Sequence, residues 1–438
     1  MKDRLKRLFL PISLAVAVGI SLVLSVSLLT NPARFSNNNH PKQKSALHND
    51  INSRNFLEVY SPTQIIQTDR DGKQQMLTSP TTNLVGEILK NMDNYHFSKI
   101  KRISTGNQQK YLDKMNYHDS LMLNYNSSIS SNIIGRILHY SGFNGKEDIN
   151  RIVLPIDDNN RMYLLSDQNH TIYQVNVKSR SLAKIHRIIR HDVTKDHVEM
   201  RLRNGRPFLY FPGQVKMKDY GYLLQEQSQS LYLSRIIGNT TNATIKHHKN
   251  STTYNSSDQG LTFSNDGNVI YNNYQTHHNV NNQEEALEAA YRNAIQLGVP
   301  LDNTKFDSYT NKDKAVNYRF FIEGFPLYGS EQLGSYSYRF INGNTERYKF
   351  SLRDFQIPVP TNRQTTILPS TRNLLRDLKN DGVDMSKVTD VKLGYQIIPD
   401  KQNNLLVTLQ STWFVKYHNK WVNYKTLSPH YQAGKENF

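Results

Sequence analysis

The sequence predicts an α+β protein with a single N-terminal transmembrane helix and a multi-domain extracytoplasmic part of antiparallel sheets with packed helices. Residues 8–29 form an uncharged, largely apolar stretch of membrane-spanning length. After it, segments that alternate apolar and polar residues follow one another across polar turns, with amphipathic helical segments between them. This remainder, roughly 400 residues, is too long for one hydrophobic core, so we expect more than one domain.

The membrane helix is predicted over residues 8–29 because no charged side chain interrupts this stretch. Lipid offers backbone amides no partner, so a span needs about 20 apolar helical residues. Residues 1–7 carry four basic side chains and one acidic one. By the positive-inside rule this tail stays in the cytoplasm, and residues 30–438 lie outside the cell membrane. A cleaved signal peptide, with residues 25–27 as its cleavage site, is the alternative, but the length of the run favours an uncleaved single-pass anchor.

One face of this helix is predicted to contact a partner helix. Ser13, Ala17, Ser21 and Ser25 recur every four residues and therefore lie in line. Small side chains in such a row let two helices approach closely, which drives association inside a membrane. The alternative is compositional, because Ser and Ala are common in membrane anchors and such a row also arises by chance.

Composition and motifs predict no enzyme and no cofactor. The chain has no cysteine, which excludes disulfides, thiol nucleophiles and cysteine metal sites. Its net charge of +17 is spread along the sequence, whereas a nucleic-acid partner would favour clustered basic and aromatic residues. The sequence has no Gly-x-Ser-x-Gly, His-Glu-x-x-His or phosphate-loop pattern, so we predict no catalytic, cofactor-binding or metal residues. Carboxylates that a glycosidase would require are present without a pattern, namely Glu323, Glu331 and Asp354.

Composition also suggests where the domains divide. Residues 30–55 are polar and aperiodic and are predicted to be a linker beyond the membrane. Residues 239–260 are rich in asparagine and are interpreted as a boundary. We therefore expect three α+β domains, which comprise residues 56–238, 261–357 and 358–438.

In the first domain, residues 57–60 are predicted to open a strand, and Pro62 to bend the chain before a second strand and the Asp71-Gly72 turn. Thr82 is the expected N-cap of a helix. Residues 121–125 alternate like a half-buried strand. The remaining expected elements are a helical segment over residues 129–138, a meander of three strands over 151–156, 161–165 and 171–177, and a helix over 181–189.

In the later domains, a hairpin is predicted from residues 261–263 to 269–271. Asn282 is expected to cap a helix over residues 283–297, which Gly298 ends. The Pro358-Val359-Pro360 segment is expected to break the chain. Further predicted elements are strands at 318–324, 336–341 and 347–352, a helix at 371–379, and strands at 388–398, 405–409, 413–417 and 421–424.

Several short motifs, in this order, resemble the YycH family, whose members are accessory regulators of the WalK/WalR (YycG/YycF) two-component system in low-GC Gram-positive bacteria. The motifs are Thr30-Asn31-Pro32, Tyr60-Ser61-Pro62-Thr63-Gln64, Tyr318-Arg319-Phe320-Phe321, Gly324-Phe325-Pro326, Leu393-Gly394-Tyr395, Val407-Thr408-Leu409 and Trp413-Phe414-Val415.

The resemblance implies an extracytoplasmic α+β part that acts with a YycI-like sister protein on a WalK-like sensor histidine kinase controlling cell-wall metabolism. It implies no enzymatic activity. From a different functional class, a cell-wall enzyme or a surface protein that binds glycan or teichoic acid is supported by the predicted location, the basic charge and the aromatic content.

Overall fold

The computed structural model describes residues 56–427, except 144, 146, 158–159, 179–180, 191–192, 239–242, 277–279, 330–331, 342 and 361–364. The predicted tail, span and linker lie outside these residues. Within the described part, no helix combines the length and the apolar character that crossing a bilayer requires. The described residues belong to a compact unit that begins at residue 54. The division into three domains stays a prediction.

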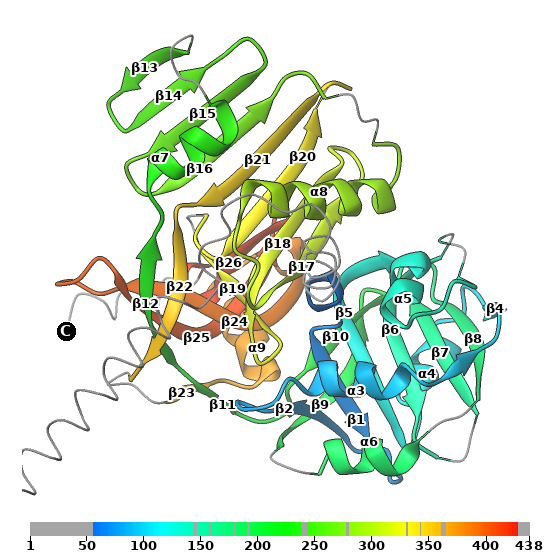
Figure 1. Cartoon of the computed structure of the whole chain (residues 1–438). Coiled ribbons are helices and arrows are strands. Elements are labelled where there is room, and N and C mark those ends of the chain that lie inside the picture. Colours follow the sequence, from blue (N-terminus) through cyan, green and yellow to red (C-terminus); the bar gives the residue numbers. More distant parts are fainter. Residues whose placement is uncertain are drawn as a thin grey trace, which may run out of the picture. The chain divides into compact units, whose positions relative to one another are not determined.

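The first large sheet contains ten described strands, and all their pairings are antiparallel (Figure 1). Their order is β10-β9-β2-β1-β5-β6-β7-β8-β3, with β4 also paired to β8. The strands are β1 (Gln64–Thr68), β2 (Gln74–Thr78), β3 (His96–Phe97), β4 (Lys101–Ser104), β5 (Ser120–Ser130), β6 (Asp148–Pro155), β7 (Arg161–Ser166), β8 (Thr171–Lys178), β9 (Thr194–Arg203) and β10 (Arg206–Tyr210).

The second large sheet contains fourteen described strands, ordered β13-β14-β15-β16-β21-β20-β18-β19-β24-β25-β12-β22, with β17 on β18 and β26 on β25. Only β19 and β24 pair in parallel among the described strands. Its strands are β12 (Tyr220–Glu226), β13 (Thr244–His248), β14 (Ser251–Asn255), β15 (Gln259–Ser264), β16 (Asn268–Asn273), β17 (Thr304–Thr310), β18 (Ala315–Ile322), β19 (Phe325–Tyr328), β20 (Ser335–Ile341), β21 (Thr345–Ser351), β22 (Arg353–Val359), β24 (Val388–Pro399), β25 (Leu406–Tyr417) and β26 (Lys420–Asn423). A separate pair joins β11 (Val215–Lys218) to β23 (Thr365–Leu368).

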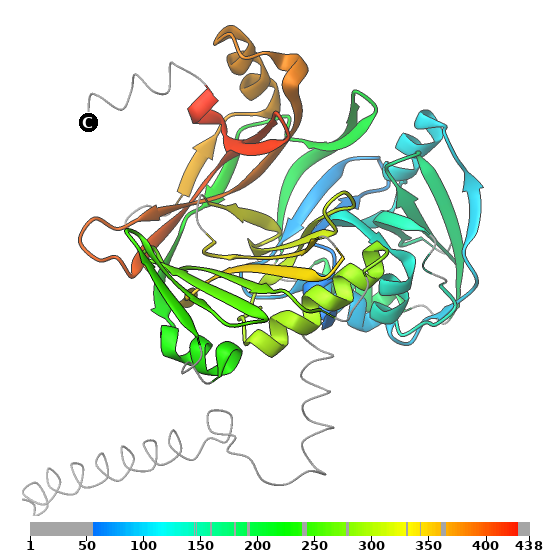
Figure 2. The ribbon, with the colours of Figure 1, turned by 90° about the horizontal axis from the view of Figure 1, so that it is seen from above.

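Helices cover these sheets. The long helix α8 (Gln283–Leu297) contacts β18 and β20 of the second sheet and also β5 of the first, and Figure 2 shows it running beside the strands. The other described α-helices are α3 (Leu84–Met92), α4 (Gln108–Met115), α5 (Ser131–Ile137), α6 (Leu182–Ile188), α7 (Gln229–Tyr232), α9 (Thr371–Asn380) and α10 (Tyr424–Leu427). A π-helical turn follows α7 at Leu233–Ile237, and a 3-10 turn lies at Met385–Lys387.

The hydrophobic core has two parts, on opposite faces of the first sheet. Along β5, Leu121 and Leu123 join one part, while Met122 between them joins the other. Because successive strand residues point to opposite faces, this alternation means that both faces of the sheet are covered. The prediction of a half-buried strand at residues 121–125 was therefore wrong: the strand is buried on both sides.

Antiparallel sheets with packed helices are confirmed, as are several elements with strong local signals. The meander from β6 to β8 and the 261–271 hairpin form as predicted. Helix α8 has the predicted bounds. The Asn282 side chain accepts a hydrogen bond from the Glu285 backbone N–H, and Gly298 ends the helix in the left-handed conformation.

Other predicted elements were wrong in type or in bounds. Residues 56–59 are helical rather than extended, because Phe56, Val59 and Tyr60 all enter one core, which requires helical spacing. The N-cap of α3 is Asn83 rather than Thr82, since the Asn83 side chain accepts the Gly86 N–H.

Two strand predictions near the C-terminus also need correction. The break expected over residues 358–360 begins later than predicted, because Pro358 lies within β22, which ends at Val359. An outermost strand of the sheet order tolerates a residue without an N–H. The segments predicted separately at 405–409 and 413–417 form one strand, β25. The described part of 239–260, expected to be a boundary, contains β13 and β14.

Candidate interaction site

The predicted contact face of the membrane helix, Ser13, Ala17, Ser21 and Ser25, lies outside the described residues and stays a prediction.

Residues 56–64 meet strands β17 to β19 in a contact region that we call the junction. The Tyr60 hydroxyl donates to the Leu287 carbonyl at 2.6 Å and shares a 2.5 Å hydrogen bond with the Tyr318 hydroxyl. Both tyrosines are fully buried. The Gln64 side-chain amide donates to the Gly324 carbonyl at 3.2 Å. These bonds tie the start of the described chain to the second sheet across more than 200 residues of sequence.

Gly324 is needed for the close approach at the junction. Its φ is +83°, and a Cβ at this position would lie 2.5 Å from the Thr63 carbonyl oxygen. Any other residue would meet both backbone strain and a clash with backbone. The segments 60–64 and 324–326, which carry part of the family resemblance, thus contact each other in the fold.

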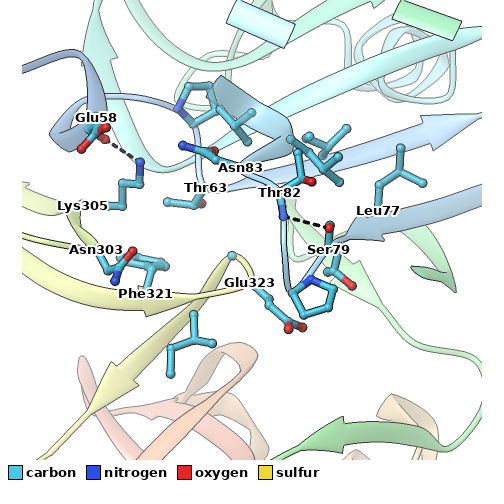
Figure 3. Close-up of a pocket in the computed structure, with 18 of the residues that line it drawn as sticks. Glu58, Thr63, Leu77, Ser79, Thr82, Asn83, Asn303, Lys305, Phe321 and Glu323 are labelled. Carbon is cyan, nitrogen blue, oxygen red and sulfur yellow. Dashed lines mark hydrogen bonds between the residues drawn. The ribbon is translucent and has the colours of Figure 1, made fainter. Parts of the chain in front are cut away.

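A cleft of about 410 Å³ lies beside the junction (Figure 3). Its walls come from residues 77–85 between β2 and α3, from β12, and from residues 301–305 and 321–324. Figure 3 shows Lys305 and Glu58 on one side, and the Thr82 N–H donating to the Ser79 hydroxyl on the other. The lining is mainly polar and suits hydrogen bonding.

Lys305 lines this cleft and bonds to the segment at residues 58–61. Its Nζ donates to the Glu58 carbonyl at 2.6 Å and to the Ser61 hydroxyl at 2.7 Å. Burial of the amine lowers the pKa of Lys305 to about 8, while the nearby Glu58 carboxylate opposes this decrease. The sequence analysis did not identify Lys305, because its partners lie more than 240 residues away and no local pattern marks the contact.

Two of the three carboxylates considered for a glycosidase are described, and they lie in different settings. Glu323 accepts a hydrogen bond from the Tyr220 hydroxyl at 2.5 Å, and burial raises the pKa of Tyr220. Asp354 lies on β22, where burial raises its pKa to about 6. Glu331 lies outside the described residues. Among the described side chains, no three His, Asp or Glu residues gather as a metal site would require.

An apolar surface lies on the end of the second sheet, where β22, β12, β25 and β24 run side by side. Ile357 is 49% exposed and Ile398 is 41% exposed. Leu223 stands opposite both Ile357 and Leu406 in register, which places these residues on one face, and alternate neighbours such as Val407 and Leu409 point into the core. We call Leu223, Ile357, Val359, Ile398 and Leu406 the apolar face.

This apolar face was missed because residues 358–360 were interpreted as a break, so Ile357 was not assigned to a strand. Contiguous apolar side chains on a protein surface indicate a contact with another molecule. The face is therefore a candidate contact surface within the described part of the chain.

Two protein-family models match the chain. They are "YycH protein, N-terminal domain", over residues 9–193, and "YycH protein, C-terminal domain", over residues 208–429. The fold is similar to the crystal structure of YycH from Bacillus subtilis, with a TM-score of 0.66 and 14% identity, covering 84% of this chain and 96% of that chain.

A crystal structure of an uncharacterized protein from Eubacterium rectale gives a TM-score of only 0.31 at 11% identity, covering 50% of this chain and 81% of that chain. No curated protein matches the sequence significantly.

Proposed function

The chain belongs to the YycH family, and from this membership we propose that it is a non-enzymatic, membrane-anchored regulator of a sensor histidine kinase in a two-component system. The observation that carries the proposal is the match of both family domains, which together extend over most of the sequence. The proposed partners are a WalK-like (YycG-like) kinase and a YycI-like sister protein, and the controlled process is cell-wall metabolism.

The proposed arrangement places the chain in the cell membrane with residues 1–7 in the cytoplasm and residues 30–438 outside. Contacts with partners form at two surfaces. Inside the bilayer, the Ser13, Ala17, Ser21 and Ser25 face packs against a partner helix. Outside, the apolar face on β22, β12, β25 and β24 packs against the sister protein, which removes the exposed Ile357 and Ile398 side chains from water.

The absence of an enzymatic role is part of the proposal. Lys305 and Glu323, the ionisable groups that border the cleft from β17 and from the β18–β19 turn, each bond to a fixed protein group: Lys305 to the Glu58 carbonyl and Glu323 to the Tyr220 hydroxyl. Such bonds support a structural role for both residues.

Co-purification tests this proposal. The native protein is recovered from detergent-solubilised membranes, and the material bound to it is identified. We expect a sensor kinase and a sister membrane protein in the complex. Recovery of cell-wall fragments without either protein would contradict the regulator and favour a wall enzyme or a glycan-binding protein.

A further inference from the structure

A second hollow region shares the lining residue Thr63 with the cleft at the junction. It lies where the β9–β10 hairpin and the loop after β7 meet β24 and β25. It consists of two adjoining cavities of about 130 and 570 Å³ that share several lining residues, including Asp167, Phe208 and Asp390. We call this region the basic cleft, because its charged lining is mostly cationic.

Cations outnumber carboxylates here. Five basic side chains line the two cavities against two carboxylates, Asp167 and Asp390, which leaves a surplus of three positive charges. The basic residues are Arg151, Arg203, Arg206, Lys392 and Lys416.

The strand register determines which charged residues of the basic cleft stand opposite each other. Arg203 and Arg206 stand directly opposite each other at the end of the β9–β10 hairpin, an arrangement that is normally destabilising. On the facing strands, Lys416 stands opposite Asp390. Burial lowers the pKa of Lys416, and the positive charges of Lys392 and Arg206 lower it further.

Two guanidinium groups also have donors without partners. Arg151 is buried, with 9% of its side chain exposed, and its Nη1 is bonded to Asp167 and Tyr111. Its Nε has no hydrogen-bond partner among the described residues, and neither has the buried Nη1 of Arg203. Leaving a charged donor unsatisfied is more costly than leaving a neutral one, so these two N–H groups suit an acceptor supplied from outside the chain.

We propose that the basic cleft binds a phosphate group, either as the free anion or as a phosphodiester within a longer molecule. A phosphate presents several acceptor oxygens and one to two negative charges, which match the unpartnered arginine N–H groups and the cationic surplus. The site does not depend on the regulator proposal, because it is defined by charge and hydrogen bonding on surfaces away from the apolar face.

Calorimetric titration of the full-length protein in detergent tests the site. Inorganic phosphate is one titrant and bis-glycerol phosphate, a phosphodiester, is the other. We expect at least one to bind, with affinity that falls as the salt concentration rises, and the tighter of the two identifies the source of the phosphate group. The double variant Arg203→Gln/Lys416→Gln should weaken binding by about tenfold or more.

The matched control is Arg372→Gln/Lys216→Gln, which removes two exposed cations outside the basic cleft and should leave binding unchanged. If the first double variant fails to fold, Arg206→Gln replaces it, since Arg206 is exposed at the hairpin end. Failure of both titrants to bind would overturn the proposal. So would equal weakening by the control variant, or unchanged binding in the cleft variant.

Discussion

The hydroxyl oxygens of Tyr60 and Tyr318 lie 2.5 Å apart, although 258 residues separate the two tyrosines in sequence. Tyr60 also donates to the Leu287 carbonyl of α8. One buried side chain thus connects the first described segment, a strand of the second sheet and the helix that covers it.

Tyr60→Phe should destabilise the protein by about 1–2 kcal/mol, because Leu287 loses its shorter hydrogen bond and Tyr318 loses a partner in a buried setting. Thermal unfolding of the full-length protein measures the effect. Tyr274→Phe, at an exposed tyrosine, is the control and should change stability little. A Tyr60→Phe protein as stable as the parent would show that the junction does not depend on this bond.

The lowered pKa of Lys305 leads us to expect that the stability of the protein changes with pH. Its pKa is about 8 in the folded protein, below its ordinary value of 10.5, so the unfolded chain binds more protons between these values. The free energy of unfolding therefore rises as pH increases from about 8 to about 10. Below this window the folded protein bears the full cost of burying the protonated Lys305 amine. Relative to Lys305→Met, which cannot titrate, the parent should gain on the order of 1 kcal/mol between about pH 7 and about pH 9.5.

Unfolding temperatures of both proteins at the two pH values provide the comparison, and the difference between the proteins cancels the titration of other groups. An identical difference at both pH values would mean that Lys305 has an ordinary pKa.

We expect that polar substitutions on the apolar face weaken partner binding without destabilising the fold. Ile357→Ser/Ile398→Ser removes two exposed apolar side chains, so the fold should be little affected, while recovery of the sister protein should fall by about fivefold or more. Ile103→Ser/Ile245→Ser changes two equally exposed isoleucines elsewhere and is the control. Equal recovery of the sister protein with both double variants would show that the apolar face does not bind it.

The proposed membrane helix leads to a second prediction of lost association. Ala17→Leu/Ser21→Leu keeps the span apolar but should push a partner helix away, at a cost of about 1–2 kcal/mol, or roughly five- to thirtyfold in complex population. Leu14→Ile/Val18→Leu changes the span without enlarging the small-residue face and should do much less. Kinase recovery and the output of a promoter that the kinase controls are measured at matched protein levels. If Ala17→Leu/Ser21→Leu matches the parent in both kinase recovery and promoter output, the row of small residues reflects only the composition of the segment and not a helix contact.

Elements whose signals are local could be predicted from the sequence, and contacts between distant segments could not. Asn282 and Gly298 define both ends of α8 through their own backbone geometry. The helical turn at residues 56–59 was predicted as a strand because its core partners come from distant parts of the chain. Strand β22 was not predicted because it contains Pro358. A proline is tolerated there only because the strand lies at the edge of the sheet, which the sequence does not show.

The candidate sites show the same division. The small-residue row of the proposed span can be recognised from its spacing in the sequence. The apolar face can be recognised only from the strand register, which pairs Leu223 with Ile357 and Leu406. Among the described residues, those that carried the family resemblance are mainly packing residues. For example, Gly394 lies against the Pro326 carbonyl, and the Trp413 indole donates to the Pro369 carbonyl.

The most direct test of the regulator account is the autophosphorylation rate of the partner kinase, reconstituted in lipid nanodiscs with its sister protein, in the presence and absence of this full-length chain. The account predicts that adding the chain changes the rate by about fivefold or more, and that Ala17→Leu/Ser21→Leu combined with Ile357→Ser/Ile398→Ser abolishes the change. An unchanged rate, with all three proteins incorporated in the same discs, would contradict it.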